Sequence, residues 1–112
     1  MAPTVINHYG QVCLDASFNC QNLQKEFGKK TSSLSSSKAK LINECAHVCM
    51  GTFHAIKNRS VNAGLLAILC IGICDECADF CESFNSPIFK QCADACRYCS
   101  NNMSDLALSA LS

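Results

Sequence analysis

The cysteines between residues 70 and 81 are spaced by four, three and four residues, at Cys70, Cys74, Cys77 and Cys81. At about 100° per residue, this spacing places them within an arc of about 60° on a helix. Four carboxylates fall on the opposite side of the same helix: Asp75, Glu76, Asp79 and Glu82. The thiols are therefore expected to face a core and the carboxylates to face solvent. Thiolates are soft ligands, so a buried row of them indicates a metal site.

The other cysteines extend this pattern to a total of eleven in 112 residues. Neighbours on such a helix face have β-carbons roughly 5–6 Å apart, whereas a disulfide needs about 3.8 Å. An odd number also leaves one thiol unpaired within a monomer. The spacing therefore favours metal over disulfides. The candidate metal ligands are Cys13, Cys20, Cys45, Cys49, Cys70, Cys74, Cys77, Cys81, Cys92, Cys96 and Cys99.

Four amphipathic segments must position these thiols. Apolar residues at three- and four-residue spacing predict helices over about 4–27, 35–57, 61–84 and 87–101, with a tail over 102–112. Ser86 and Pro87 are typical of an N-cap and a first helical residue. Short connections make neighbouring helices antiparallel. The sequence thus predicts an all-α, antiparallel up-down-up-down four-helix bundle, a single domain over 1–112, with cysteines lining its core.

Composition excludes several classes of function. Nine basic and nine acidic residues balance, so neither a nucleic acid nor an anionic membrane is an expected partner. The longest apolar run, 63–74, is shorter than the roughly 20 residues that span a bilayer. The first residues have no basic or apolar signal segment, which predicts a cytoplasmic, reduced protein, although a removed export leader would leave no trace. The exposed carboxylates have no partnered histidine, so no catalytic residues and no enzyme are expected.

Charge favours a monovalent ion. Burying eleven negatively charged thiolates without basic residues would cost too much desolvation free energy. The metal-free core should therefore be protonated and should release protons when it binds metal. Zn²⁺ with four thiolates leaves two excess negative charges, whereas Cu(I) bridged by thiolates approaches one positive charge per sulfur. A linear S–Cu–S unit spans about 4.6 Å if its bonds resemble the roughly 2.3 Å of zinc–thiolate sites.

The Cys-x3-Cys and Cys-x2-Cys repeats of residues 70–81 and 92–99 resemble those of the four-helix-bundle copper storage proteins. The resemblance implies a bundle that stores or buffers multiple Cu(I) ions between cysteine pairs, commonly as a homo-oligomer, a tetramer, and that exchanges copper with a donor or acceptor protein. The first two helices carry only two cysteines each, so a smaller capacity than in cysteine-richer relatives is expected.

Other readings remain open. An iron–sulfur electron carrier, a zinc or heavy-metal buffer and a redox relay all use closely spaced cysteines.

His47, His54 and Met50 are expected on a solvated or oligomer-facing stripe, and His8 on the surface. Met103 continues the row of Cys99 as either a thioether ligand or a packing residue. Ions are expected to enter near Cys20, Cys81 and Cys92, because aromatic and aliphatic residues such as Tyr9 and Phe53 close the opposite end.

Overall fold

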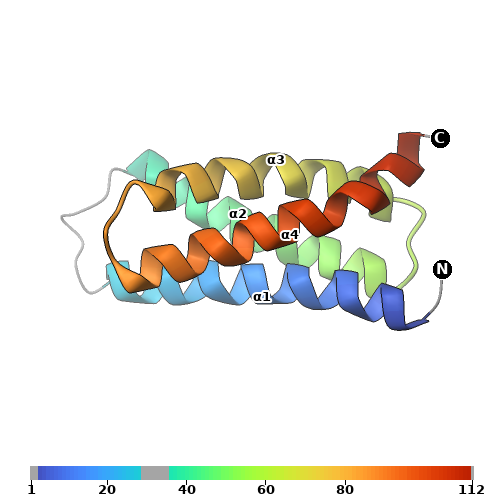
Figure 1. Cartoon of the computed structure of the whole chain (residues 1–112), viewed down its shortest axis with the longest axis horizontal. Coiled ribbons are helices and arrows are strands. Elements are labelled where there is room, and N and C mark those ends of the chain that lie inside the picture. Colours follow the sequence, from blue (N-terminus) through green and yellow to red (C-terminus); the bar gives the residue numbers. More distant parts are fainter. Residues whose placement is uncertain (1–2, 29–35, 112) are drawn as a thin grey trace.

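The computed structural model describes residues 3–28 and 36–111, with side chains over 8–26 and 37–108. The described chain forms four helices and no strand: α1 (Pro3–Gly28), α2 (Ser36–Lys57), α3 (Ala63–Glu82) and α4 (Pro87–Leu111). They run along the long axis of a body of 44 × 22 × 20 Å (Figure 1). The predicted all-α four-helix class is confirmed.

Consecutive helices pack side by side and alternate in direction, and α1 also packs against α4 to close the ring (Figure 1). The start of α1, the 58–62 connection and the end of α4 lie together, and we call this the 58–62 end. The 83–86 connection lies at the other, which we call the 83–86 end. This antiparallel order brings thiols from every helix to one axis. None of the described helices combines the length and apolarity needed to cross a membrane.

The connection between α2 and α3 is a tight capped turn. The Ser60 N–H donates to the Ala55 carbonyl (2.8 Å) and the Arg59 N–H to the Ile56 carbonyl (3.1 Å). Arg59 is left-handed, with φ 54°. These are the paired bonds of a Schellman motif, with Arg59 in the place that glycine usually takes. Because the turn extends through residue 62, α3 begins at Ala63 rather than at the predicted 61, and it ends at Glu82 rather than at 84.

The last helix differs most from expectation. It begins at Pro87 as predicted, and the Ser86 carbonyl accepts its first bond from the Lys90 N–H (3.0 Å). The predicted tail over 102–112 is wrong, because α4 continues to Leu111. Met103 and Ala107 are buried one turn apart. Packing on this face therefore outweighs the weak helix propensity of Asn101 and Asn102. The Asn102 amide donates to the Tyr98 carbonyl (2.8 Å) along the helix.

The carboxylates of α3 lie on the outer surface, as predicted, and three of the four bind a residue of α4. Arg97 forms ion pairs with Asp75 (3.5 Å), Asp79 and Glu82 (2.7 Å). All four side chains are at least one-third exposed, so each pair adds at most about 1 kcal/mol. This network tethers α3 to α4 and keeps charge outside the thiol core.

Candidate metal centre

Every one of the eleven cysteines is completely buried and none is in a disulfide. They come from all four helices, two each from α1 and α2, four from α3 and three from α4. The helical spacing of the cysteines puts them on the inner faces, because each helix also buries alanine or aliphatic residues at the same period. The structure therefore gathers all the predicted site residues in one core. Their role as metal ligands stays a prediction.

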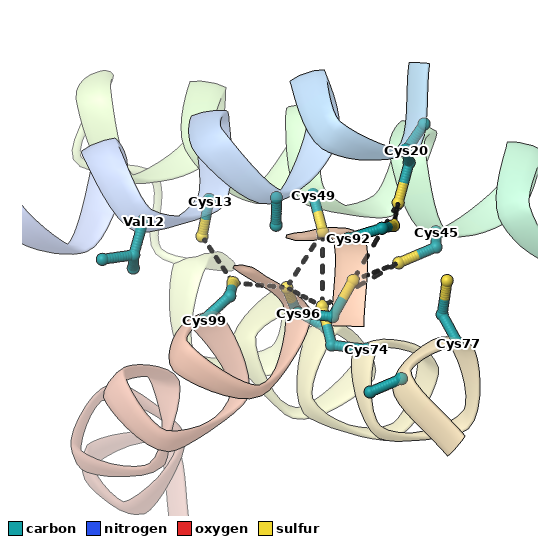
Figure 2. Close-up of a cluster of buried hydrophobic side chains, with 14 of the residues drawn as sticks. Val12, Cys13, Cys20, Cys45, Cys49, Cys74, Cys77, Cys92, Cys96 and Cys99 are labelled. Carbon is teal, nitrogen blue, oxygen red and sulfur yellow. Dashed lines mark hydrogen bonds between the residues drawn. The ribbon is translucent and has the colours of Figure 1, made fainter. Parts of the chain in front are cut away.

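The sulfur atoms form a continuous chain of contacts along the bundle axis (Figure 2). The chain begins with Cys13 and Cys99 (3.7 Å) and passes from Cys99 to Cys70 (3.7 Å). Cys70 lies 3.8 Å from both Cys49 and Cys74. This half of the chain therefore draws a sulfur from each of the four helices.

Cys74 leads into the second half of the chain, at 3.9 Å from Cys45. Cys45 lies 3.9 Å from Cys96, which lies 4.0 Å from Cys20. Cys20 and Cys92 (3.7 Å) complete the series. Nine of the eleven sulfurs thus belong to this series, each within 4.0 Å of another, so neighbouring ions in this core would share ligands.

Two four-thiol groups stand out within this chain. In each group, the sulfur atoms lie within 4.8 Å of one another: Cys20, Cys77, Cys92 and Cys96 in one, and Cys49, Cys70, Cys74 and Cys99 in the other. A three-thiol group of Cys45, Cys74 and Cys96 shares one member with each and joins them. A linear S–Cu–S unit needs about 4.6 Å, so small rotamer shifts adapt these sulfurs to Cu(I).

The core offers few ligands other than sulfur. The two completely buried hydroxyls are already engaged: Ser17 donates to the Ala46 carbonyl (2.8 Å) and Thr52 to the Val48 carbonyl (2.7 Å). Among the described residues, no buried side-chain nitrogen or oxygen lacks a hydrogen-bond partner. No lysine or arginine is buried in the described core. A cation taken into this core would therefore be bound and neutralised by sulfur.

Mutual hydrogen bonding divides the thiols into two sets. Hydrogen bonds to neighbouring thiols, together with burial, raise the pKa of Cys13, Cys20, Cys49, Cys74, Cys81, Cys92 and Cys96. Hydrogen bonds from neighbouring thiols favour the thiolate and lower the pKa of Cys45, Cys70, Cys77 and Cys99. The seven thiols with raised pKa hold their protons more tightly than a free thiol does, and binding a metal must displace those protons.

Apolar residues cover both ends of the thiol row. Tyr9 and Ile56 are buried at the 58–62 end, as expected. The 83–86 end is covered too, because Leu23, Ile42 and Phe89 are buried one turn beyond Cys20, Cys45 and Cys92. Phe89 stacks on Phe84, with ring centroids 4.1 Å apart. An ion that enters near Cys20 would therefore have to pass this apolar layer. The sequence did not predict the layer, because Phe84 and Phe89 lie in and beside the 83–86 connection.

The histidines lie away from the sulfurs, on the exposed surface. The His47 ring Nδ1 lies 2.8 Å from the Asn43 carbonyl, and His47 lines a shallow pocket of about 170 Å³ with Met50. His8 Nε2 lies 2.8 Å from the Asn102 side-chain oxygen. Met103, in contrast, is completely buried beside Cys13. Among the residues whose role the sequence left open, Met103 therefore lies in the core, whereas the histidines lie on the surface.

The comparisons with known proteins agree with this geometry. A family model described as copper storage protein matches residues 4–108. Among solved structures, the Cu(I)-bound copper storage protein BsCsp3 is similar, with a TM-score of 0.84 and 23% sequence identity. The match covers 92% of this chain and 98% of that chain. No curated protein matches the sequence. The likeness to BsCsp3 supports the four-helix fold, and the family match extends over the whole thiol row.

Proposed function

Since this chain belongs to the copper storage protein family, we propose that it stores Cu(I) by filling its core with many ions held between cysteine thiolates. The observation that carries the proposal is the continuous row of buried sulfurs drawn from all four helices. Each ion would bind two or more thiolates and share some of them with its neighbours. Stored copper would then occupy the length of the row rather than one closed site.

Charge supports Cu(I) as the stored ion. Eleven thiolates and eleven Cu(I) ions are neutral together, whereas Zn²⁺ in four-thiolate sites leaves excess negative charge in a core without basic residues. BsCsp3 was solved with Cu(I) bound. Soft thiolates also prefer Cu(I). These arguments favour copper over the iron–sulfur and zinc alternatives.

The proposal includes a role without catalysis, in the cytoplasm. Storage needs only uptake and release, and the family to which the chain belongs is described as a storage family. Eleven free thiols suit a reducing compartment. Copper would be exchanged with a donor or acceptor protein by stepwise transfer between thiolates. Otherwise a Cu(I) ion that leaves the core would have no ligands in solution.

An anaerobic Cu(I) titration, with a chromophoric chelator as competitor, tests this function. The expected result is uptake on the order of one Cu(I) per thiolate, with loss of one proton per thiol ionised. Saturation at one or two equivalents contradicts storage.

Two alanine variants refine this titration. The sulfur of Cys74 lies 3.4 Å from that of Cys49 and 3.9 Å from that of Cys45, and Cys74 belongs to two thiol groups. Cys81 belongs to none of the three. Cys74→Ala should therefore lose about two or three ions, and Cys81→Ala about one. Equal losses would show that ions do not share thiolates.

An exposed apolar stripe on α3 suits assembly with further copies. Leu65, Ile68 and Leu69 are 37–61% exposed, and Gly72 continues the stripe one turn later. Exposed Arg59 precedes this stripe and exposed Glu76 follows it. When two copies of α3 pair antiparallel about Leu69, the basic end of one stripe meets the acidic end of the other. We therefore assign this face to a homo-oligomer, as the resemblance to tetrameric proteins also implies.

Leu69→Glu tests that surface. The added charge should disrupt the paired stripes, so the variant is expected to run at a lower mass than the parent protein in light scattering coupled to size exclusion, with unchanged helicity. Leu108→Glu adds the same charge at an exposed leucine of α4, and it should keep the parent mass. If the parent is already monomeric, or if Leu69→Glu keeps the parent mass, this face is not the interface.

A further inference from the structure

The row of thiols continues, at the 58–62 end, into a methionine. Met103 is completely buried, and its sulfur lies 3.5 Å from the sulfur of Cys13. Cys13 in turn lies 3.7 Å from Cys99. Beyond Met103, the buried residues Tyr9, Ile56 and Ala107 carry no sulfur. Met103 is therefore the last sulfur at this end of the described core.

Packing alone does not account for this arrangement. A buried methionine is an adaptable filler that can present either its methyl group or its sulfur to a neighbour. Here the Cys13 thiol donates to the Met103 sulfur, so the thioether takes part in the same sulfur network as the thiols. Met103 also follows Cys99 by four residues, which continues the inner face of α4 by one turn.

The end of the row is also where a neutral ligand is useful. Cys13 has two thiol neighbours, Cys99 and Cys70, besides Met103, whereas Cys74 has four, Cys45, Cys49, Cys70 and Cys96. An ion at Cys13 would therefore have few thiolates within reach. A thioether is a soft donor for Cu(I), it carries no charge, and it needs no deprotonation. It can complete the coordination of such an ion without adding negative charge to the core.

We propose that Cys13, Cys99 and Met103 form a mixed thiolate–thioether Cu(I) site that ends the storage row. This inference rests on the proposed storage function and adds a ligand type and a position to it. Two thiolates give the site a net charge of −1 with one Cu(I), where three thiolates would give −2. The site lies at the opposite end of the row from Cys20 and Cys92.

Selenium X-ray absorption on Cu(I)-loaded, selenomethionine-labelled full-length protein tests the site directly. The chain has three methionines, so the parent protein is compared with Met50→Leu and Met103→Leu. Leucine is close to methionine in volume, so both variants should fold. A selenium–copper scattering path at bonding distance is expected in the parent and in Met50→Leu, and its loss in Met103→Leu. Met103→Leu should also hold about one Cu(I) fewer per chain.

The outcomes separate the two proposals. Full copper uptake without a selenium–copper path in the parent overturns the thioether site and leaves storage intact. A path that disappears in Met50→Leu instead places the copper at the surface pocket and also overturns the site. Failure of the parent to take up copper at all refutes storage itself. The selenium path requires a bond to copper, so a purely structural role of Met103 would not produce it.

Discussion

The metal-free protein is expected to lose about 4 kcal/mol of its free energy of unfolding between pH 7.5 and pH 9.5. Burial and hydrogen bonding raise the pKa of seven thiols in the folded state, while an unfolded chain has thiols that ionise near pH 8.5. As pH rises through the unfolded value, the unfolded chain releases protons that the folded core retains, so the free energy of unfolding falls. The four thiols with lowered pKa act in the opposite sense, because the fold has already released their protons at pH 7.5 while the unfolded chain still holds them. Each of them raises the free energy of unfolding by about 1.4 kcal/mol over the same range.

The size of this effect follows from linkage. Each thiol that stays protonated in the fold costs about 1.4 kcal/mol over these two pH units, so seven cost about 9.8 kcal/mol. The four thiols with lowered pKa offset about 5.6 kcal/mol, which leaves a net loss of about 4 kcal/mol. This net loss is a large part of the roughly 5–15 kcal/mol by which a typical domain is stable. The free energy of unfolding at each pH is measured by denaturant titration, monitored by circular dichroism under anaerobic conditions with a non-thiol reductant.

Two comparisons separate thiol ionisation from general alkaline damage. Cys81→Ala removes one of the raised thiols and should reduce the loss by about 1.4 kcal/mol. The Cu(I)-loaded protein has already released its thiol protons, so its free energy of unfolding should not fall over the same range. An equal free energy of unfolding for the metal-free protein at pH 7.5 and pH 9.5 would refute the protonated core.

Cu(I) loading is expected to stabilise the fold by more than about 10 kcal/mol. Each ion present at a hundredfold excess over its dissociation constant adds about 2.7 kcal/mol, and the row provides many sites. Ligands from all four helices meet in the groups around Cys74 and Cys96, so copper there joins the helices to one another. Binding of copper by the unfolded chain's thiols reduces the gain but cannot reproduce this convergence.

The measurement compares guanidinium unfolding of the metal-free and Cu(I)-loaded protein by circular dichroism. The loaded protein should remain helical at denaturant concentrations that unfold the metal-free form. Addition of a Cu(I) chelator in excess should restore the metal-free curve, which serves as the control. Coincident curves with copper still bound to the protein would show that the ions do not bridge the helices.

Much of this molecule could be predicted from the sequence, because helical periodicity is a local property. The spacing from Cys70 to Cys81 indicated which face of α3 is buried, and the same reasoning located the inner thiols of α1, α2 and α4. Charge balance then favoured a soft monovalent ion. The confirmed elements, the four helices and their alternating order, follow from amphipathic segments joined by short connections.

The errors came from positions where local signals compete with packing. The sequence predicted a helix end at 101, but burial of Met103 and Ala107 keeps α4 helical to Leu111. Likewise, the left-handed Arg59 turn delays the start of α3, because its capping bonds involve backbone groups that carry no sequence signature.

The sequence by itself determined that eleven thiols line the inside of a four-helix bundle, since that depends only on periodicity along each helix. Only the tertiary structure decided which sulfurs meet: that Cys74 and Cys96 each belong to two groups, that Leu23 and Phe89 cover the 83–86 end, and that Met103 reaches Cys13. The physical reason is that the relative heights of antiparallel helices depend on how their side chains interlock. A shift of one helical turn, about 5.4 Å, would give every thiol a different partner.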